Sequence, residues 1–213
     1  MRNNIADIRK DYKLQTLLED NVHQDPNEQF SVWWNEALAS SIEEVNAMTL
    51  ATATRGGQVS ARIVLLKGFD KNGFVFFTNY NSHKGTELDE NPNAALVFFW
   101  RELERQVRIE GVVEKISEAE SDAYYHSRPE GSRIGAWASP QSQIMSRAEL
   151  EEKFEAFRLQ FSEAPISRPP HWGGYRVKAH RVEFWQGRPS RLHDRILYEK
   201  DFQGNWKIER LAP

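Results

Sequence analysis

Apolar residues recur along this chain at two different spacings, and the change between them marks how the chain is organised. Asp25-Pro26 has the form of a helix start, with proline in the first turn. Helical spacing follows at Phe30, Trp33, Trp34, Ala37, Leu38, Ile42 and Val45. From Met48 onward, short apolar runs alternate with tight turns, which is typical of antiparallel strands. We therefore expect strands at residues 48–54, 59–67, 74–78, 94–100, 106–116, 175–185, 195–199 and 206–211.

Helical patterns interrupt these strands in the middle of the chain. Residues 82–91 predict a short helix that ends before Pro92. Ser117 and Ser146 each begin a capping box, in which a serine is followed three residues later by a glutamate. We expect a helix to begin at each of these serines, and the first of the two to end at Arg128-Pro129.

The order of these elements predicts the fold class. Short strands joined by tight turns, with helices at their flanks, favour a mainly β fold built as an antiparallel barrel or sandwich. Strand patterns stand on both sides of the helical middle, so residues 28–213 are expected to form a single domain. Residues 1–27 are polar and are expected to form a mobile N-terminal arm.

Composition removes several classes of protein. A chain of 213 residues can bury a core large enough to need no covalent staples, and the absence of cysteine excludes disulfides, thiolate zinc sites and cysteine nucleophiles. The net charge of −3 argues against a nucleic-acid partner held by phosphate contacts. No apolar run approaches the ~20 residues of a membrane-spanning helix, and the N-terminus lacks the apolar core of a secretion signal. We expect no membrane partner and a cytoplasmic location.

The common catalytic motifs are also missing. The sequence has no Gly-x-Gly-x-x-Gly, no P-loop, no His-Glu-x-x-His and no Gly-x-Ser-x-Gly. Its 6 histidines show no metal-ligand spacing, so no metal site is expected.

Basic residues placed among apolar ones are the first candidates for binding chemistry. Arg62 and Lys67 stand at the two ends of an apolar strand. Each is either a cation at the strand edge whose charged group extends into solvent, or a residue that binds an anion. His83 and Lys84 stand at the start of the predicted helix 82–91, whose free N–H groups favour a phosphate. Two candidate clamps in one chain favour a phosphorylated ligand.

Two further clusters combine polar and aromatic side chains. One lies at the end of a predicted helix and in the loop after it, and consists of Tyr124, Tyr125, His126, Ser127, Arg128 and Ser132. Its plainer interpretation is a helix C-cap formed by Arg128. The other joins Trp185-Gln186-Gly187 to the stretch 191–195. In an extended chain Arg191, His193 and Arg195 would share one face, and a salt-bridged strand end is the alternative.

Taken together, these residues resemble the pyridoxamine 5′-phosphate oxidase family. The resemblance covers nearly the whole chain, with motifs in the family's order and at similar spacing. It is carried by Arg62-Ile63-Val64-Leu65-Leu66-Lys67, Phe77-Thr78-Asn79, Glu104-Arg105-Gln106-Val107, His126-Ser127-Arg128-Pro129, Ile134-Gly135-Ala136-Trp137, Gln141-Ser142, Phe184-Trp185-Gln186-Gly187, Arg191-Leu192-His193-Asp194-Arg195 and Arg210-Leu211-Ala212-Pro213.

The resemblance implies a split β-barrel homodimer that binds FMN at the subunit interface. The residues that match the family's FMN site are Arg62, Ile63, Val64, Leu65, Leu66, Lys67, Phe77, Thr78, His83, Lys84, Gln106, Gln141, Ser142, Trp185 and Arg195. Those that match its substrate site are Arg9, Lys10, Asp11, Tyr12, Lys67, Tyr124, Arg128, Ser132, Arg191, Leu192 and His193. Within this set Arg191 and His193 match the catalytic pair that faces the pyridine ring, and residues 9–12 match a segment that can fold over the site.

The chain departs from the family at a few positions. His83 stands where the family usually has arginine, and a histidine is only partly charged near neutral pH. The grip on the FMN phosphate is therefore expected to be weaker and pH-dependent. Phe77 replaces a common tyrosine, Glu44-Val45 stands where Asp-Pro often occurs, and Lys10-Asp11 replaces an Arg-Glu-like pair.

The activity implied by the resemblance is oxidation of phosphorylated vitamin B6. The substrate would be pyridoxamine or pyridoxine 5′-phosphate, the product pyridoxal 5′-phosphate, and the electron acceptor dioxygen, which yields hydrogen peroxide; the amine also releases ammonia. Two alternatives stay open. One is a flavin oxidoreductase with the same barrel and another substrate, and the other is a carrier that binds pyridoxal phosphate without oxidising anything.

Overall fold

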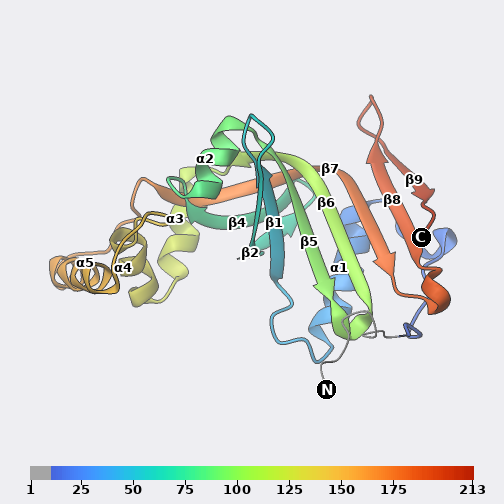
Figure 1. Cartoon of the computed structure of the whole chain (residues 1–213), viewed down its shortest axis with the longest axis horizontal. Coiled ribbons are helices and arrows are strands. Elements are labelled where there is room, and N and C mark those ends of the chain that lie inside the picture. The colour runs from blue at the N-terminus through green and yellow to red at the C-terminus, as the bar shows by residue number, and fades with distance from the viewer. Residues whose placement is uncertain (1–10) are drawn as a thin grey trace, which may run out of the picture. The chain divides into compact units, whose positions relative to one another are not determined.

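The computed structural model describes residues 11–213, and most of them lie in strands and in the helices between the strands (Figure 1). The strands are β1 (Ala47–Ala53), β2 (Val59–Leu65), β3 (Gly68–Asp70), β4 (Gly73–Asn79), β5 (Asn93–Trp100), β6 (Arg105–Lys115), β7 (Trp172–Gln186), β8 (Asp194–Lys200) and β9 (Trp206–Arg210). The α-helices are α1 (Pro26–Leu38), α2 (His83–Glu90), α3 (Glu118–Ser127), α4 (Glu130–Ala138) and α5 (Arg147–Gln160). Short 3₁₀ turns occur at Glu19–Asn21, Arg101–Leu103 and Pro189–Arg191.

One hydrogen-bonded path runs through the strands in the order β2-β1-β5-β6-β7-β4-β3, and β8 pairs with both β7 and β9. The β3–β4, β4–β7, β7–β8 and β8–β9 ladders are antiparallel. The register places Thr78 opposite Gly173 and Trp185 opposite Arg195. The prediction of a mainly β fold with flanking helices is confirmed.

The chain groups into two compact units, and strands β1, β5, β6 and β7 contribute residues to both. Unit 1 comprises the described part of residues 1–49 together with 95–110 and 179–213. Unit 2 comprises residues 50–94 and 111–178. No helix among the described residues has the length and the apolar character needed to cross a membrane.

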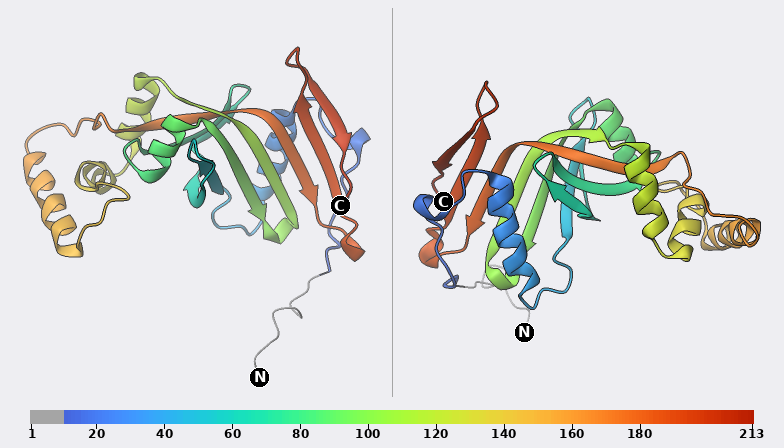
Figure 2. Two further views of the ribbon diagram at one scale, coloured as in Figure 1. Left: turned by 45° about the horizontal axis from the view of Figure 1, so that its top comes forward. Right: turned by 180° about the vertical axis from the view of Figure 1, so that it is seen from behind.

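In unit 1, helix α1 covers one face of the strands (Figure 2, right). Asp25 caps the helix by accepting a hydrogen bond from the Asn27 backbone at 2.7 Å. Phe30 is fully buried, and its ring centroid lies 5.2 Å from that of Phe98 on β5. Trp33 meets Phe184 of β7 edge to face at 5.2 Å. The aromatic periodicity of α1 therefore builds the core of this unit.

In unit 2, the helices α3, α4 and α5 share a second apolar cluster, and α4 and α5 lie beside each other (Figure 1). Its buried members are Tyr125, Ile134, Ala136, Ile166 and Trp172. Phe154, Phe157 and Phe161 of the α5 region pack against it. Both predicted capping boxes are present, at Ser117 and Ser146.

The structure departs from the expected elements at several points. Helix α1 ends at Leu38, so Ile42 and Val45 are not helical; Val45 is buried from a loop, where its carbonyl accepts the Trp100 indole N–H at 3.1 Å. The strand expected to reach Lys67 ends at Leu65 and is followed by the short strand β3. Helix α4 is not expected from the sequence, because Pro129 favours the end of the preceding helix; in the structure Pro129 is also the N-cap residue of α4.

The described part of the N-terminal segment contacts the rest of unit 1. Leu17 is buried, and its backbone N–H donates to Asp194 Oδ2 at 3.0 Å. The Lys13 backbone N–H donates to Glu104 Oε2 at 2.8 Å. The mobile arm over residues 1–27 and the single domain over 28–213 stay predictions.

Candidate functional site

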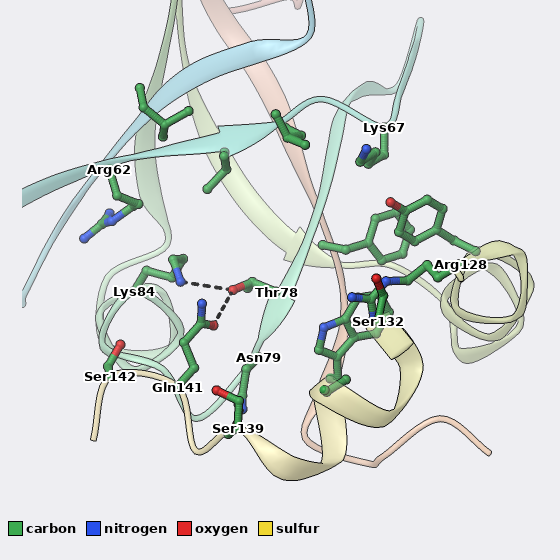
Figure 3. Close-up of a pocket in the computed structure, with 18 of the residues that line it drawn as sticks. Arg62, Lys67, Thr78, Asn79, Lys84, Arg128, Ser132, Ser139, Gln141 and Ser142 are labelled. Carbon is green, nitrogen blue, oxygen red and sulfur yellow. Dashed lines mark hydrogen bonds between the residues drawn. The ribbon is translucent and has the colours of Figure 1, made fainter. Parts of the chain in front are cut away.

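A cavity of about 790 Å³ opens in unit 2 and is bordered by β2, β4 and helices α2, α3 and α4 (Figure 3). It is lined by many of the residues singled out from the sequence: Arg62, Ile63, Val64, Leu65, Lys67, Phe77, Thr78, His83, Lys84, Tyr124, Arg128, Ser132, Gln141 and Ser142. Leu66 does not line it and is buried elsewhere. Five further residues that line it were not predicted as site residues: Asn79, Gly135, Ala136, Ser139 and Trp172.

One end of the cavity carries Arg62, Lys84 and the hydroxyl and amide groups beside them (Figure 3). The Lys84 ammonium donates to Thr78 Oγ1 at 3.1 Å, and the Thr78 hydroxyl donates to Gln141 Oε1 at 3.2 Å. Burial, followed by repulsion from Arg62, lowers the pKa of Lys84 to about 8. This end therefore concentrates hydrogen-bond donors and positive charge where they are partly shielded from solvent.

The start of α2 explains how Lys84 reaches the cavity. Ser82 is the N-cap of this helix, and its hydroxyl accepts the Gly85 backbone N–H at 3.4 Å. The backbone of Tyr80 passes so close that a Cβ at Gly85 would lie 2.0 Å from its carbonyl oxygen. Only glycine permits this approach, which sets the first turn of α2, with His83 and Lys84, at the edge of the cavity.

The other end of the cavity is aromatic and cationic. The rings of Phe77 and Tyr124 stack with centroids 3.9 Å apart, and Trp172 is nearly parallel to Tyr124. The Arg128 guanidinium lies 4.5 Å from the centre of the Trp172 ring, and the Lys67 ammonium lies 5.9 Å from that of Tyr124. This end therefore holds two cations against a wall of stacked rings.

Arg128 carries the most informative atom of the site. Its Nη1 is buried and has no hydrogen-bond partner among the described residues. Burial also lowers the pKa of this guanidinium. A buried charged donor without a partner is costly, and an anion bound in the cavity would satisfy it. The C-cap interpretation holds only for the backbone of Arg128, whose N–H donates to the Tyr125 carbonyl at 3.2 Å.

A second cluster of predicted residues lies in unit 1. The Trp185 and His193 ring centroids are 4.6 Å apart, and Tyr12 lies 5.7 Å from Trp185 and 5.9 Å from His193. A Cβ at Gly187 would lie 2.6 Å from the Tyr12 ring, so this glycine makes room for Tyr12. The Arg188 backbone N–H donates to His193 Nδ1 at 3.1 Å. Burial, and next the positive charge of Arg191, lower the pKa of His193.

The stretch 191–195 is not the extended segment expected from the sequence. Residues 189–191 form a 3₁₀ turn, Ser190 and Arg191 have φ angles of 57° and 62°, and β8 begins only at Asp194. The expectation that Arg191, His193 and Arg195 share one strand face is therefore wrong. Arg191 and Leu192 are exposed, and Arg191 makes no hydrogen bond or ion pair with the described part of the chain.

Neighbouring charges in unit 1 are paired. The Arg195 guanidinium donates to both oxygens of the buried Glu183, at 2.8 and 3.1 Å, and to the Ala212 carbonyl. Asp194 accepts hydrogen bonds from Arg210 and from the Leu17 backbone. The salt-bridged alternative therefore describes Asp194 and Arg195 correctly.

The remaining predicted site residues fall in unit 1 or outside the described chain. Gln106 is partly buried on β6, and Asp11 is exposed. Arg9 and Lys10 lie outside the described residues. No group of three or more potential metal ligands occurs among the described residues.

The fold and the cavity together define a mainly β protein whose cavity carries cationic side chains at both ends, and comparison with known proteins gives the family. The family model described as "Pyridoxamine 5'-phosphate oxidase" matches residues 34–164. The model described as "Pyridoxine 5'-phosphate oxidase C-terminal dimerisation region" matches residues 172–213. The chain belongs to the pyridoxamine 5′-phosphate oxidase family, and the predicted enzyme class is confirmed.

Curated relatives match over almost the entire chain. A pyridoxine/pyridoxamine 5′-phosphate oxidase of Bordetella pertussis is 59% identical over 98% of this chain and 99% of its own length. One of Trichormus variabilis is 58% identical over 100% of both chains. The match to the dimerisation region supports a homodimer.

Solved structures confirm the split-barrel fold. PhzG from Burkholderia lata, in complex with tetrahydrophenazine-1-carboxylic acid, gives a TM-score of 0.87 at 31% identity over 94% of this chain and 99% of that one. A pyridoxamine 5′-phosphate oxidase-related, FMN-binding protein from Nostoc punctiforme gives a TM-score of 0.69 at 20% identity, covering 86% of this chain and 97% of that one.

Proposed function

We propose that this chain is an FMN-dependent oxidase that converts pyridoxamine or pyridoxine 5′-phosphate to pyridoxal 5′-phosphate. Dioxygen would accept the electrons and give hydrogen peroxide, and the amine substrate would also release ammonia. The observation that carries the proposal is the cavity of unit 2, which has a cationic site at each end. A phosphorylated cofactor and a phosphorylated substrate would each occupy one end.

The Arg62 and Lys84 end fits the phosphate of FMN. Lys84, Thr78 and Gln141 form a connected hydrogen-bond chain. Burial lowers the pKa of Lys84 to about 8, and the negative charge of a bound anion would favour the protonated ammonium again. Ser142 at the rim adds a hydroxyl. Ile63, Val64 and Leu65 supply an apolar wall along which a flat ring system could lie.

The Arg128 end fits the phosphate of the substrate. Arg128 offers an unpartnered buried donor, Lys67 a second cation, and Tyr124 and Ser132 hydroxyl groups from α3 and α4. These four residues would fix the phosphate and thereby the position of the reacting carbon. Phosphate-free substrates would bind poorly because the Arg128 donor would stay unsatisfied.

When bound, FMN supplies the hydride-accepting chemistry, and the protein supplies placement and charge. His193 would act as a hydrogen-bond donor: its Nδ1 already accepts the Arg188 N–H, so the neutral ring carries its proton on Nε2. That proton would be donated to the oxygen of the hydroxyl group on the pyridine ring of the substrate. Arg191, exposed in its 3₁₀ turn, would orient the ring and stabilise developing negative charge.

We further infer that FMN lies between two subunits, as the resemblance implies. Gln106, Trp185 and Arg195 match FMN contacts and belong to unit 1, whereas the phosphate-binding side chains line the cavity of unit 2. A second copy of the chain would complete the site, which the match to the dimerisation region supports.

The decisive experiment combines spectroscopy and turnover. The purified protein is expected to show the visible absorption of bound flavin and, with pyridoxine 5′-phosphate in air, to produce aldehyde and peroxide in equal amounts. A colourless protein that does not bind added FMN would overturn the proposal. The relationship to PhzG provides a matched comparison: turnover of a phosphate-free ring acid in preference to pyridoxine 5′-phosphate would favour the alternative of another substrate.

A further inference from the structure

A buried carboxylate immediately before β6 binds the N-terminal segment of unit 1, and the proposed function does not use it. Glu104 has only 3% of its surface exposed, and its Oε2 accepts the backbone N–H groups of Lys13 at 2.8 Å and of Leu14 at 3.2 Å. Residues 13 and 14 belong to neither a helix nor a strand. The carboxylate therefore supplies the hydrogen bonds that a helix or a strand ladder would otherwise give to this backbone.

The backbone of Glu104 is fixed to the end of β7. Its φ and ψ angles are 55° and 40°, a left-handed conformation that is strained for a residue other than glycine and persists only where the surroundings impose it. Its carbonyl accepts the Gly187 backbone N–H at 2.7 Å and the Gln186 side-chain amide at 3.2 Å. Both partners directly follow Trp185, so one residue connects the N-terminal segment with the strand end that carries this tryptophan.

Apolar burial contributes little to holding residues 13–16 in place. All four residues are exposed, and Leu14 has 56% of its surface open to solvent. Their attachment depends on hydrogen bonds, such as the one from Arg188 Nη1 to the Gln15 carbonyl at 3.0 Å. A segment with few buried apolar contacts opens more readily than the sheet beside it. Loss of the Glu104 carboxylate would therefore shift this segment toward a detached state.

Tyr12 is the side chain whose position depends on this attachment. It directly precedes the two bound N–H groups, and its ring meets those of Trp185 and His193 edge to face, at 5.7 and 5.9 Å. On its other side, the imidazole of His193 accepts the Arg188 backbone N–H at Nδ1. The tyrosine ring and this hydrogen bond together restrict rotation of the imidazole.

We infer that Glu104 is a positioning residue of the enzyme, which holds Tyr12 against His193 by binding the two backbone N–H groups that follow Tyr12. The imidazole that would face the substrate ring is thereby fixed. This inference rests on the proposed function, because it needs His193 to contact the substrate. Glu104 does not line the cavity of unit 2, so binding of the flavin phosphate should not depend on it.

The first measurement follows detachment of the segment and does not need turnover. Trypsin can cut the purified protein between Lys13 and Leu14, and the rate of cutting reports the population of the open form. Glu104→Ala is expected to raise this rate about tenfold, as for the loss of one hydrogen bond to a charged group. Glu104→Gln keeps an oxygen that can accept both N–H groups and should stay within about threefold of the native chain. An unchanged rate in Glu104→Ala would overturn the inference.

Steady-state kinetics with pyridoxine 5′-phosphate separate positioning from general structural damage. Glu104→Ala and Tyr12→Ala are each expected to lower kcat/KM about tenfold through lost orientation, with FMN retained. The double variant should also lie about tenfold below the native chain, because the second substitution removes an interaction that is already lost. Independent effects would multiply to about a hundredfold and would overturn the inference. Glu102→Ala removes an exposed carboxylate from the turn before Glu104 and is the matched control, which should match the native chain in both measurements.

Gly187→Ala displaces Tyr12 without changing the carboxylate, and it keeps the inference testable even if Glu104→Ala fails to fold. The added Cβ would lie 2.6 Å from the Tyr12 ring, so the ring must move away. We expect kcat/KM to fall about tenfold, as in Glu104→Ala. A native kcat/KM in Gly187→Ala would overturn the inference. A native chain that did not oxidise pyridoxine 5′-phosphate would overturn the proposed function, and the cleavage rates would still decide whether Glu104 anchors the segment.

Discussion

Arg128 in the cavity of unit 2 differs from Arg195 and Arg210 of unit 1 in having a buried donor without a partner in the described part of the chain. Arg62, at the other end of the cavity, is instead paired with Glu87, with 3.2 Å between Nη2 and Oε2. In the cavity, Arg128 keeps a buried Nη1 without a partner among the described residues. In unit 1, Arg195 is bound to both oxygens of Glu183, and Arg210 is bound to Asp194. An unsatisfied cation prepares a site for an anion, whereas a paired one stabilises the fold. In the proposed function, Arg128 therefore offers a buried donor to the substrate phosphate before any ligand binds.

Arg191 is the exception in unit 1, and its replacement is the strongest test of the comparison. It has no partner among the described residues and has a left-handed backbone, a conformation that non-glycine residues adopt at a cost of about 1–3 kcal/mol and that is found mostly at functional sites. We expect Arg191→Met to lower turnover about a hundredfold or more, as when a group that stabilises the transition state is lost. FMN should be retained. Near-normal kcat of the purified holoenzyme would remove Arg191 from the reaction.

Arg128 tests the cavity side of the comparison. Arg128→Ala removes a partly buried cation, and we expect the KM for pyridoxine 5′-phosphate to rise about thirtyfold, corresponding to about 2 kcal/mol for a charge-assisted hydrogen bond. Bound flavin should remain, since Arg128 lies at the other end of the cavity from Lys84 (Figure 3). Lys153→Ala removes an equal charge from α5, outside this cavity, and serves as the control. An equal rise of KM in both variants would indicate a general effect of charge.

Lys84 provides a test by pH. In the proposed function its protonated form would bind the phosphate of FMN, and its pKa in the free protein is about 8 because of burial and of repulsion from Arg62. The affinity for FMN should therefore fall as the pH rises through 8, by about tenfold between pH 7 and 9. Lys84→Met should bind FMN weakly, losing its yellow colour on dialysis, and should lack this pH dependence. The pH dependence would have another origin if it persisted in Lys84→Met.

Local signals predicted much of this architecture. The strands and capped helices follow from periodicity and from Ser117 and Ser146, because alternation and capping depend on residues close in sequence. Arg62 and Lys84 could be predicted as candidate anion ligands from the sequence, since each is a cation in an apolar or helix-start setting, and both line the cavity. The resemblance then added residues such as Gln141, which has no distinctive local pattern.

Contacts between residues far apart in the sequence could not be predicted from local sequence patterns. Nothing near Trp172 in the sequence indicates that it stacks beside Tyr124 and under Arg128. The left-handed backbone of Arg191 was missed because alternation was assumed to continue from β8. Glu87 could have been found as the residue four positions after His83, but its link to Arg62 depends on the packing of α2 against β2.

The smallest expected effect concerns the paired side of the comparison. Glu183 is buried and binds both Arg195 and Arg108, so Glu183→Gln removes the charge that holds two arginines. Because both arginines are partly exposed, water replaces much of the lost interaction, and we expect the free energy of unfolding to fall by about 1 kcal/mol. Chemical denaturation of the cofactor-free protein measures this loss. Turnover of the holoenzyme should stay close to that of the native chain. A large loss of FMN affinity at unchanged stability would instead show that Glu183 positions Arg195 for contact with the cofactor. In that case only Asp194 and its partners would remain as an example of charges in unit 1 that are paired for stability alone.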